Sequence, residues 1–213
     1  MASIPTPTYA PVAQKKQAYT NSCGAASLLC AATELGSTHL GNQPLDTRTN
    51  ASETQIYQAT SGAYSMGNPE NSGYSFPDRI VATGRALGLN GHVHMTNSLP
   101  SQVIKYFGGN VVNNLHATGV PIEEGPERQL AANQRRLRVV VVTANVAGRV
   151  PVMAGLHYIM ERPDGSIMDP ASGRNYNNIH ELNQEMAQAG LPGVGRMMST
   201  HYANSGISVV LTG

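Results

Sequence analysis

The residue of this chain whose type and surroundings most clearly allow chemistry is Cys23. It follows the polar residues Thr20-Asn21-Ser22 and opens an alanine- and leucine-rich run with the pattern of a helix. A thiol in the first turn of a helix lies beside unpaired backbone N–H groups and the positive end of the helix dipole, which both favour the nucleophilic thiolate. The polar loop before it and the glycine after it predict an exposed thiol.

His157 is the best-placed base for such a thiolate. It begins a β pattern that is followed by the turn signal 163–165 and then by Asp169. If the turn is a three-residue loop, His157 and Asp169 are diagonal neighbours on one face, whereas a two-residue loop places them on opposite faces. In the first case Asp169 accepts the Nδ1–H of His157, and Nε2 is free to take the thiol proton. Asn145 and Asn175 are weaker candidates for the orienting role.

Gln17 lies in the loop that leads into the predicted Cys23 helix. A side-chain amide at this place can set its NH₂ beside the backbone N–H of Cys23. Together the two donors would form an oxyanion hole. The predicted catalytic set is therefore Cys23, His157, Asp169 and Gln17.

These residues and their order resemble the papain-like cysteine peptidases. The resemblance is carried by Gln17, by Cys23-Gly24-Ala25-Ala26, by Gly155-Leu-His157-Tyr-Ile and by Ile167-Met-Asp169-Pro-Ala-Ser-Gly173. It is nearest to the branch that contains bacteriocin-processing, double-glycine-type peptidase domains. It implies a papain fold, in which a helical lobe carries Cys23 and an antiparallel sheet lobe carries His157 and Asp169. The chain departs from the papain pattern in having no tryptophan.

Composition excludes several other classes. The net charge is +1 and only 13% of the 213 residues are charged, so we expect no nucleic-acid partner and no binding to an anionic membrane. The basic cluster 135–138 is interpreted as a solvated end of an element. His92 and His94 share one face of a strand, but no third ligand stands near them, so no metal and no cofactor is expected.

The two cysteines and the N-terminus suggest where the protein is made. Cys23 and Cys30 lie seven residues apart on one predicted helix, about 10.5 Å along its axis, which is too far for a disulfide. Cys30 is interpreted as a small buried apolar residue. The start of the chain has neither the basic residues nor the apolar run of a secretory signal. We therefore expect synthesis in the cytoplasm, with export or delivery into a target cell without a cleavable signal left open.

The order of predicted elements indicates an α+β fold, with a helical layer packed on an antiparallel sheet. Residues 1–16 are predicted to be an extended arm and residues 17–213 a papain-like domain. A capping box at 52–55 predicts the start of a second helix. Helices are predicted over 23–35, from residue 52 onward, and over 77–88, 98–107 and 178–190. Strands are predicted over 91–95, 137–143, 150–162, 166–169 and 205–212.

Three functions are compatible with these residues. The first is a cysteine protease that cuts peptide bonds of a protein or peptide substrate through an acyl-enzyme, as a secreted effector or toxin. The second keeps the Cys-His-Asp site but deamidates glutamine or transfers the acyl group to an amine, as a transglutaminase does. The third is a binding protein on a degenerate peptidase scaffold. The sequence does not decide the substrate or the oligomeric state.

Overall fold

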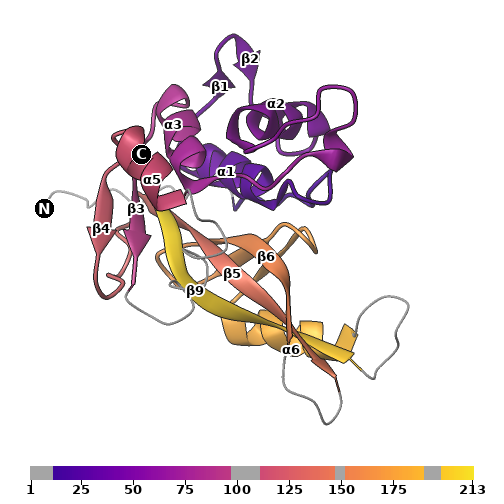
Figure 1. Cartoon of the computed structure of the whole chain (residues 1–213). Coiled ribbons are helices and arrows are strands. Elements are labelled where there is room, and N and C mark those ends of the chain that lie inside the picture. The colour runs from indigo at the N-terminus through magenta and orange to yellow at the C-terminus, as the bar shows by residue number, and fades with distance from the viewer. Residues whose placement is uncertain (1–11, 97–110, 147–151, 190–197) are drawn as a thin grey trace, which may run out of the picture.

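The computed structural model describes residues 12–96, 111–146, 152–189 and 198–213 (Figure 1). Its helices are α1 (Cys23–Glu34), α2 (Asn50–Thr60), the 3₁₀ turn η1 (Pro69–Asn71), α3 (Pro77–Ala86), α5 (Val111–Ala117) and α6 (Ile179–Ala189). Its strands are β1 (His39–Leu40), β2 (Gln43–Pro44), β3 (Asn90–Met95), β4 (Ile122–Glu124), β5 (Gln134–Val146), β6 (Val152–Glu161), β7 (Ile167–Asp169), β8 (Arg174–Tyr176) and β9 (Met198–Thr212). None of the helices in these ranges has the length and apolar character needed to cross a membrane.

The larger sheet has seven strands in the order β4-β3-β9-β5-β6-β7-β8. Its neighbouring strands are antiparallel, except for the parallel pair of β3 and β4. The helices α1, α2 and α3 lie on one side of this sheet and α6 lies on the other (Figure 1). The predicted α+β architecture, with N-terminal helices packed on a mostly antiparallel sheet, is therefore confirmed.

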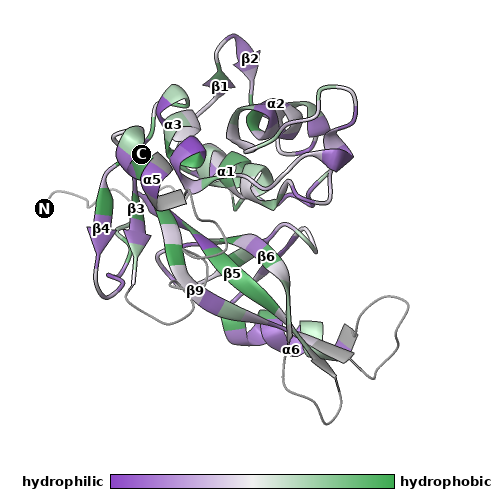
Figure 2. Ribbon diagram, in the orientation of Figure 1, coloured by the Kyte–Doolittle hydropathy of each residue, from purple (hydrophilic) through white to green (hydrophobic). Residues whose placement is uncertain are grey.

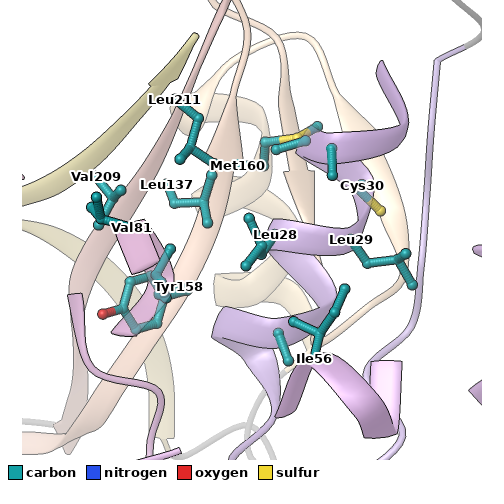
Figure 3. Close-up of a cluster of buried hydrophobic side chains, with 14 of the residues drawn as sticks. Leu28, Leu29, Cys30, Ile56, Val81, Leu137, Tyr158, Met160, Val209 and Leu211 are labelled. Carbon is teal, nitrogen blue, oxygen red and sulfur yellow. The ribbon is translucent and has the colours of Figure 1, made fainter. Parts of the chain in front are cut away.

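The helix α1 is the centre of the helical layer. Its run of alanine, leucine and small residues favours a helix that other elements can surround closely, and every residue from Cys23 to Ala32 is buried. It ends where predicted, because Gly36 adopts a positive φ of 89° just beyond the last turn. Leu28 and Leu29 pack into the core between α2 and the sheet, and Cys30 is buried there as a free thiol (Figure 3).

Strand alternation gives the sheet two apolar faces. Leu137, Val209 and Leu211 belong to the main core between the sheet and the helical layer (Figure 3). Figure 2 shows the hydrophobic residues along α1 and β5. Side chains on the opposite face form a second, smaller cluster with α6. Its buried members are Val140, Ile159, Ile167, Tyr176, Leu182 and Tyr202.

A buried ion pair joins α1 to the strands that carry the predicted base. The carboxylate of Glu34, at the end of α1, accepts hydrogen bonds from Arg162 at 2.7 Å and from Arg135 at 2.6 Å. It also accepts the backbone N–H of Ala13 at 3.0 Å. Glu34 therefore holds the N-terminal segment, the helix and the sheet in one arrangement.

The structure corrects several local predictions. The helix α2 begins at Asn50, and the predicted capping box is not used, because the hydroxyl of Ser52 instead accepts the N–H of Asp46. The strand β9 is longer than expected and β8 was not foreseen. The interpretation of 135–138 as a solvated end is wrong, because Arg136 is only 5% exposed and all three arginines pair with glutamates. The helix predicted over 98–107 lies outside the described residues.

Candidate active site

Cys23 is the first residue of α1, as predicted. No described side chain caps this end of the helix, and no acidic residue lies in its first turn, so its backbone N–H groups and positive dipole act on the thiol. The preceding loop is held by the buried carboxylate of Glu53 on α2, which accepts from Ser22 Oγ at 2.6 Å and from Ala18 N at 2.8 Å. Lys15 completes the network with an ion pair to Glu53 at 3.3 Å.

The residue after Cys23 has no room for a side chain. A Cβ at Gly24 would lie 2.6 Å from Ser75 Cβ and 3.2 Å from Tyr158 Cδ2. The segment before α3 and the strand β6 thus approach α1 directly beside Cys23. The Cys-Gly pair in the sequence reflects this close packing as well as the chemistry of the thiol.

The strand register brings His157 and Asp169 together. Arg162 N donates to Ser166 O around the three-residue loop 163–165, and Glu161 pairs with Ile167, which is the register required for diagonal neighbours. The Nε2 atom of His157 lies 2.7 Å from Asp169 Oδ1. The prediction that Asp169 binds Nδ1 is therefore wrong, because Asp169 binds Nε2. The Cys23 thiol lies close enough to the ring to interact with it.

Backbone N–H groups hold the Asp169 carboxylate in place. Ala171 N donates to Oδ1 at 3.2 Å and Ser172 N donates to Oδ2 at 3.0 Å, as is usual for an aspartate at the start of a turn. The weaker candidate Asn175 does not replace it. Asn175 accepts a hydrogen bond from Arg162 at 2.9 Å, and the side chain of Asn145 lies outside those that the structure describes.

The electrostatics of these residues favour a charged histidine. Burial alone would lower the pKa of His157, but the negative charge of Cys23 and the hydrogen bonds that the ring makes with Asp169 and Cys23 outweigh it and raise the pKa to about 9. Burial raises the pKa of Asp169, but the hydrogen bond and the charge of His157 outweigh this effect and keep the pKa below its usual value. The arrangement suits an imidazolium that lies beside both Cys23 and the Asp169 carboxylate. Cys30 differs, because burial raises its pKa to about 12.

The expectation of an exposed thiol is wrong, because Cys23 is only 1% exposed. Four tyrosines lie within electrostatic reach of it. Burial is the largest cause of the raised pKa of each tyrosine, and the charge of Cys23 raises each pKa further. For Tyr202 the charge of Asp169 has a larger effect than that of Cys23. The four tyrosines are Tyr57, Tyr74, Tyr158 and Tyr202. Nothing in their spacing along the sequence pointed to this surrounding shell.

Tyr74 is the most exposed member of this shell, at 38%. The backbone of Leu156 hydrogen-bonds to its phenolic oxygen and stabilises the charged form, as an N–H donor does. The same oxygen would lie 3.6 Å from a Cβ at Gly155. Tyr74 therefore connects the segment before α3 to β6, one residue away from His157.

Gln17 lies in the loop before α1, but its amide is engaged elsewhere. Its Nε2 donates to the backbone oxygens of Tyr19 and Thr20, each at 2.8 Å. Its buried Oε1 has no hydrogen-bond partner among the described residues. The Gln17 backbone N–H donates to Pro170 O at 2.8 Å, which ties this loop to the Asp169 turn.

His92 and His94, which the sequence suggested as possible metal ligands, lie apart from this site. His92 Nε2 is 3.2 Å from Glu123 Oε2, and His94 is buried at 3% exposure. Within the described ranges, no group of three or more histidine, cysteine or acidic side chains is arranged to hold a metal ion.

Comparison with known proteins places the chain in a family. The family described as "Invasion plasmid antigen J, cysteine protease" matches residues 15–213. Cysteine protease IpaJ of Shigella flexneri is 37% identical over 212 residues, which cover 93% of this chain and 77% of that protein. No solved structure matches the chain significantly. With its cysteine at the start of α1 beside a histidine and an aspartate on the sheet, the chain belongs to the invasion plasmid antigen J family of cysteine proteases.

Proposed function

We propose that this cysteine protease hydrolyses peptide bonds through a Cys23–His157–Asp169 triad. The observation that carries the proposal is the His157 ring, which hydrogen-bonds to Asp169 through Nε2 and also interacts with the Cys23 thiol. Cys23 Sγ attacks the carbonyl carbon, and the His157 imidazolium gives its proton to the leaving amine. The resulting thioester is then cleaved by a water molecule whose proton passes to His157, so that free Cys23 is restored.

The oxyanion formed during attack needs donors beside Cys23. We assign this role to the Cys23 backbone N–H at the start of α1 and to Gln17. In this structure both amide hydrogens of Gln17 go to the carbonyls of Tyr19 and Thr20. Gln17 would therefore have to turn toward the substrate when the substrate binds.

The proposal also covers the superfamily, the domain boundaries and the biological role of the chain. The helical layer that carries Cys23 and the sheet that carries His157 and Asp169 support a papain-like grouping, with residues 1–16 as an arm and 17–213 as the domain. Double-glycine-type specificity and this division remain predictions. The match to a family named for an invasion plasmid antigen supports a bacterial effector that acts on proteins of a target cell.

A second reaction of the same acyl-enzyme is kept because the triad alone does not exclude it. If ammonia leaves from a glutamine carboxamide instead of an amine from a peptide bond, the enzyme is a deamidase. If an amine then replaces water, it is an acyltransferase. Both use the same three side chains in the same positions.

The test is a search for reaction products in a target-cell proteome. New N-termini and deamidated glutamines are compared after treatment with the wild type, Cys23→Ala and Cys30→Ala. We expect new N-termini with the wild type and Cys30→Ala and none with Cys23→Ala. Deamidated glutamines without new N-termini would favour the second reaction. No difference between the wild type and Cys23→Ala, together with Cys23 labelling no faster than a free thiol, would favour the binding protein.

A further inference from the structure

The sheet face opposite α1 has two unlike halves. One half is the apolar cluster that packs against α6. In the other half, β3, β9 and β5 present polar side chains at adjacent positions of the register. His94 pairs with Ser208, and Val210 lies between His92 and Arg136.

A cavity of about 250 Å³ lies over this polar half. It is separate from Cys23, since none of the triad residues lines it. Its lining residues come from β3, β4, β5, β9 and the segment between β4 and β5: His92, His94, Glu123, Arg128, Gln129, Leu130, Gln134, Arg136 and Val210.

Several buried polar atoms here have no protein partner among the described residues. His94 is 3% exposed, and neither of its ring nitrogens has a hydrogen bond. The same holds for Nε of Arg136, a residue that is 5% exposed, and for Oγ of the fully buried Ser208. His94 and Arg136 line the cavity, and Ser208 is the strand partner of His94. Buried polar groups are normally hydrogen-bonded, so these groups indicate that something other than the described residues satisfies them.

The charges around the cavity indicate the kind of partner. The one carboxylate in the lining, Glu123, is already held by Arg128 at 3.2 Å and by His92 at 3.2 Å. Nη1 of Arg136 pairs with Glu161 at 3.4 Å and with Glu127 at 3.8 Å, and Nη2 donates to Arg128 O at 2.6 Å. The polar groups of the lining that can still take a partner are mainly N–H donors. They are the His94 ring, Arg136 Nε and the exposed guanidinium of Arg128.

We propose that this cavity binds a small oxyanion, either a phosphoryl or a carboxylate group. Such a group accepts several N–H bonds at once, and hydrogen bonds to a charged acceptor are the strong ones. In the bound state His94 and Arg136 Nε donate from the floor of the cavity, and Arg128 closes over the oxyanion from its rim. The site works independently of the proposed chemistry at Cys23.

The test is a titration of the full-length protein with inorganic phosphate, and in a parallel arm with acetate, at constant ionic strength. The histidine ring resonances are followed by NMR, and His94→Gln identifies those of His94. We expect a saturable shift of the His94 signals with one or both anions. A response to phosphate alone assigns a phosphoryl group, and a response to acetate alone assigns a carboxylate.

Two matched arginine variants make the titration decisive. Arg128 and Arg48 are both highly exposed, and each pairs with one carboxylate. We expect Arg128→Gln to weaken phosphate or acetate binding about tenfold, the effect of one charge-assisted hydrogen bond, and Arg48→Gln to leave it unchanged. A shift that grows linearly without saturation, or equal affinity in the two variants, would overturn the proposal. Ordered water would then be the partner of the buried groups.

Discussion

Cys23 combines a reactive position with nearly complete burial, at 1% exposure. It lies at the start of α1, beside unpaired backbone N–H groups, and interacts with His157. His157 in turn holds its proton to a higher pH than an ordinary histidine. The charge balance of the site therefore depends on His157 staying cationic between Cys23 and Asp169.

Asp169→Asn should lower the pKa of His157 from about 9. The asparagine carries no negative charge, so it no longer stabilises the imidazolium, and the ring loses its proton at lower pH. An NMR titration of the His157 ring measures the change. Asn175→Asp at a neighbouring position, where the side chain meets Arg162 and not His157, serves as the control. An unchanged His157 pKa in Asp169→Asn would contradict the assigned role.

Gly24→Ala should destabilise the protein by about 1–3 kcal/mol, as overpacking of a core does. The added methyl group would meet Ser75 Cβ at 2.6 Å, so the segment before α3 must move. Gly67→Ala is the matched control, because a Cβ added there would have no atom within 4 Å and the backbone of Gly67 is not in the left-handed region. Urea unfolding compares the two, and equal stabilities would show that the packing beside Cys23 is loose.

At the scale of elements, the segment between α2 and α3 packs beside Cys23, since Ser75 lies against Gly24. Ser61 and Ser75 form a β-bridge at its two ends, and Tyr74 reaches from it to Leu156 on β6. A substrate can meet Cys23 only if this segment opens. The hydrogen bond of Tyr74 is therefore expected to control access and not the chemistry.

Tyr74→Phe should speed the alkylation of Cys23 by iodoacetamide. Loss of a hydrogen bond of about 1 kcal/mol raises the open population about fivefold. Tyr64→Phe is the control, since the Tyr64 hydroxyl makes no hydrogen bond with the described residues while its ring packs on Tyr57. Mass spectrometry of the modified peptide gives the rates, with Cys30 as an internal reference. Equal rates in both variants would rule out Tyr74 as the closure.

For the whole molecule, the central contact is the buried group around Glu34. Arg162 follows β6, and its side chain binds Glu34 on α1, Ala13 O of the N-terminal segment and Asn175 on β8. It thus joins parts of the chain that are more than 100 residues apart in sequence. This contact sets the position of α1 against β6, and through it that of Cys23 against His157.

Arg162→Ala should cost about 3–5 kcal/mol of stability, because it leaves the Glu34 carboxylate buried with fewer partners. Arg174→Ala provides the comparison. Its ion pair with Glu185 is exposed, at 63% and 42%, and such pairs contribute less than about 1 kcal/mol. Thermal unfolding measured by circular dichroism distinguishes the two. Similar losses in both variants would mean that Arg135 alone satisfies Glu34.

Local sequence determined much of the architecture. The alanine-rich run after Cys23 specified α1 and Gly36 its end, the valines of 139–142 specified the middle of β5, and the turn at 163–165 set the register that makes His157 and Asp169 neighbours. These features depend on backbone propensity and on short-range pairing. These features can therefore be predicted from the sequence without knowledge of the fold.

Only the tertiary structure decided which His157 nitrogen binds Asp169, that the Cys23 thiol is buried, and that the arginines of 135–138 pair with glutamates. Each of these depends on side chains from distant segments. Tyr74 and Tyr202 come from distant segments and both lie within electrostatic reach of Cys23. Glu34 and Glu161 neutralise arginines that look like a surface cluster in sequence. Periodicity and spacing describe neighbours along the chain, whereas burial and charge pairing arise from neighbours in space.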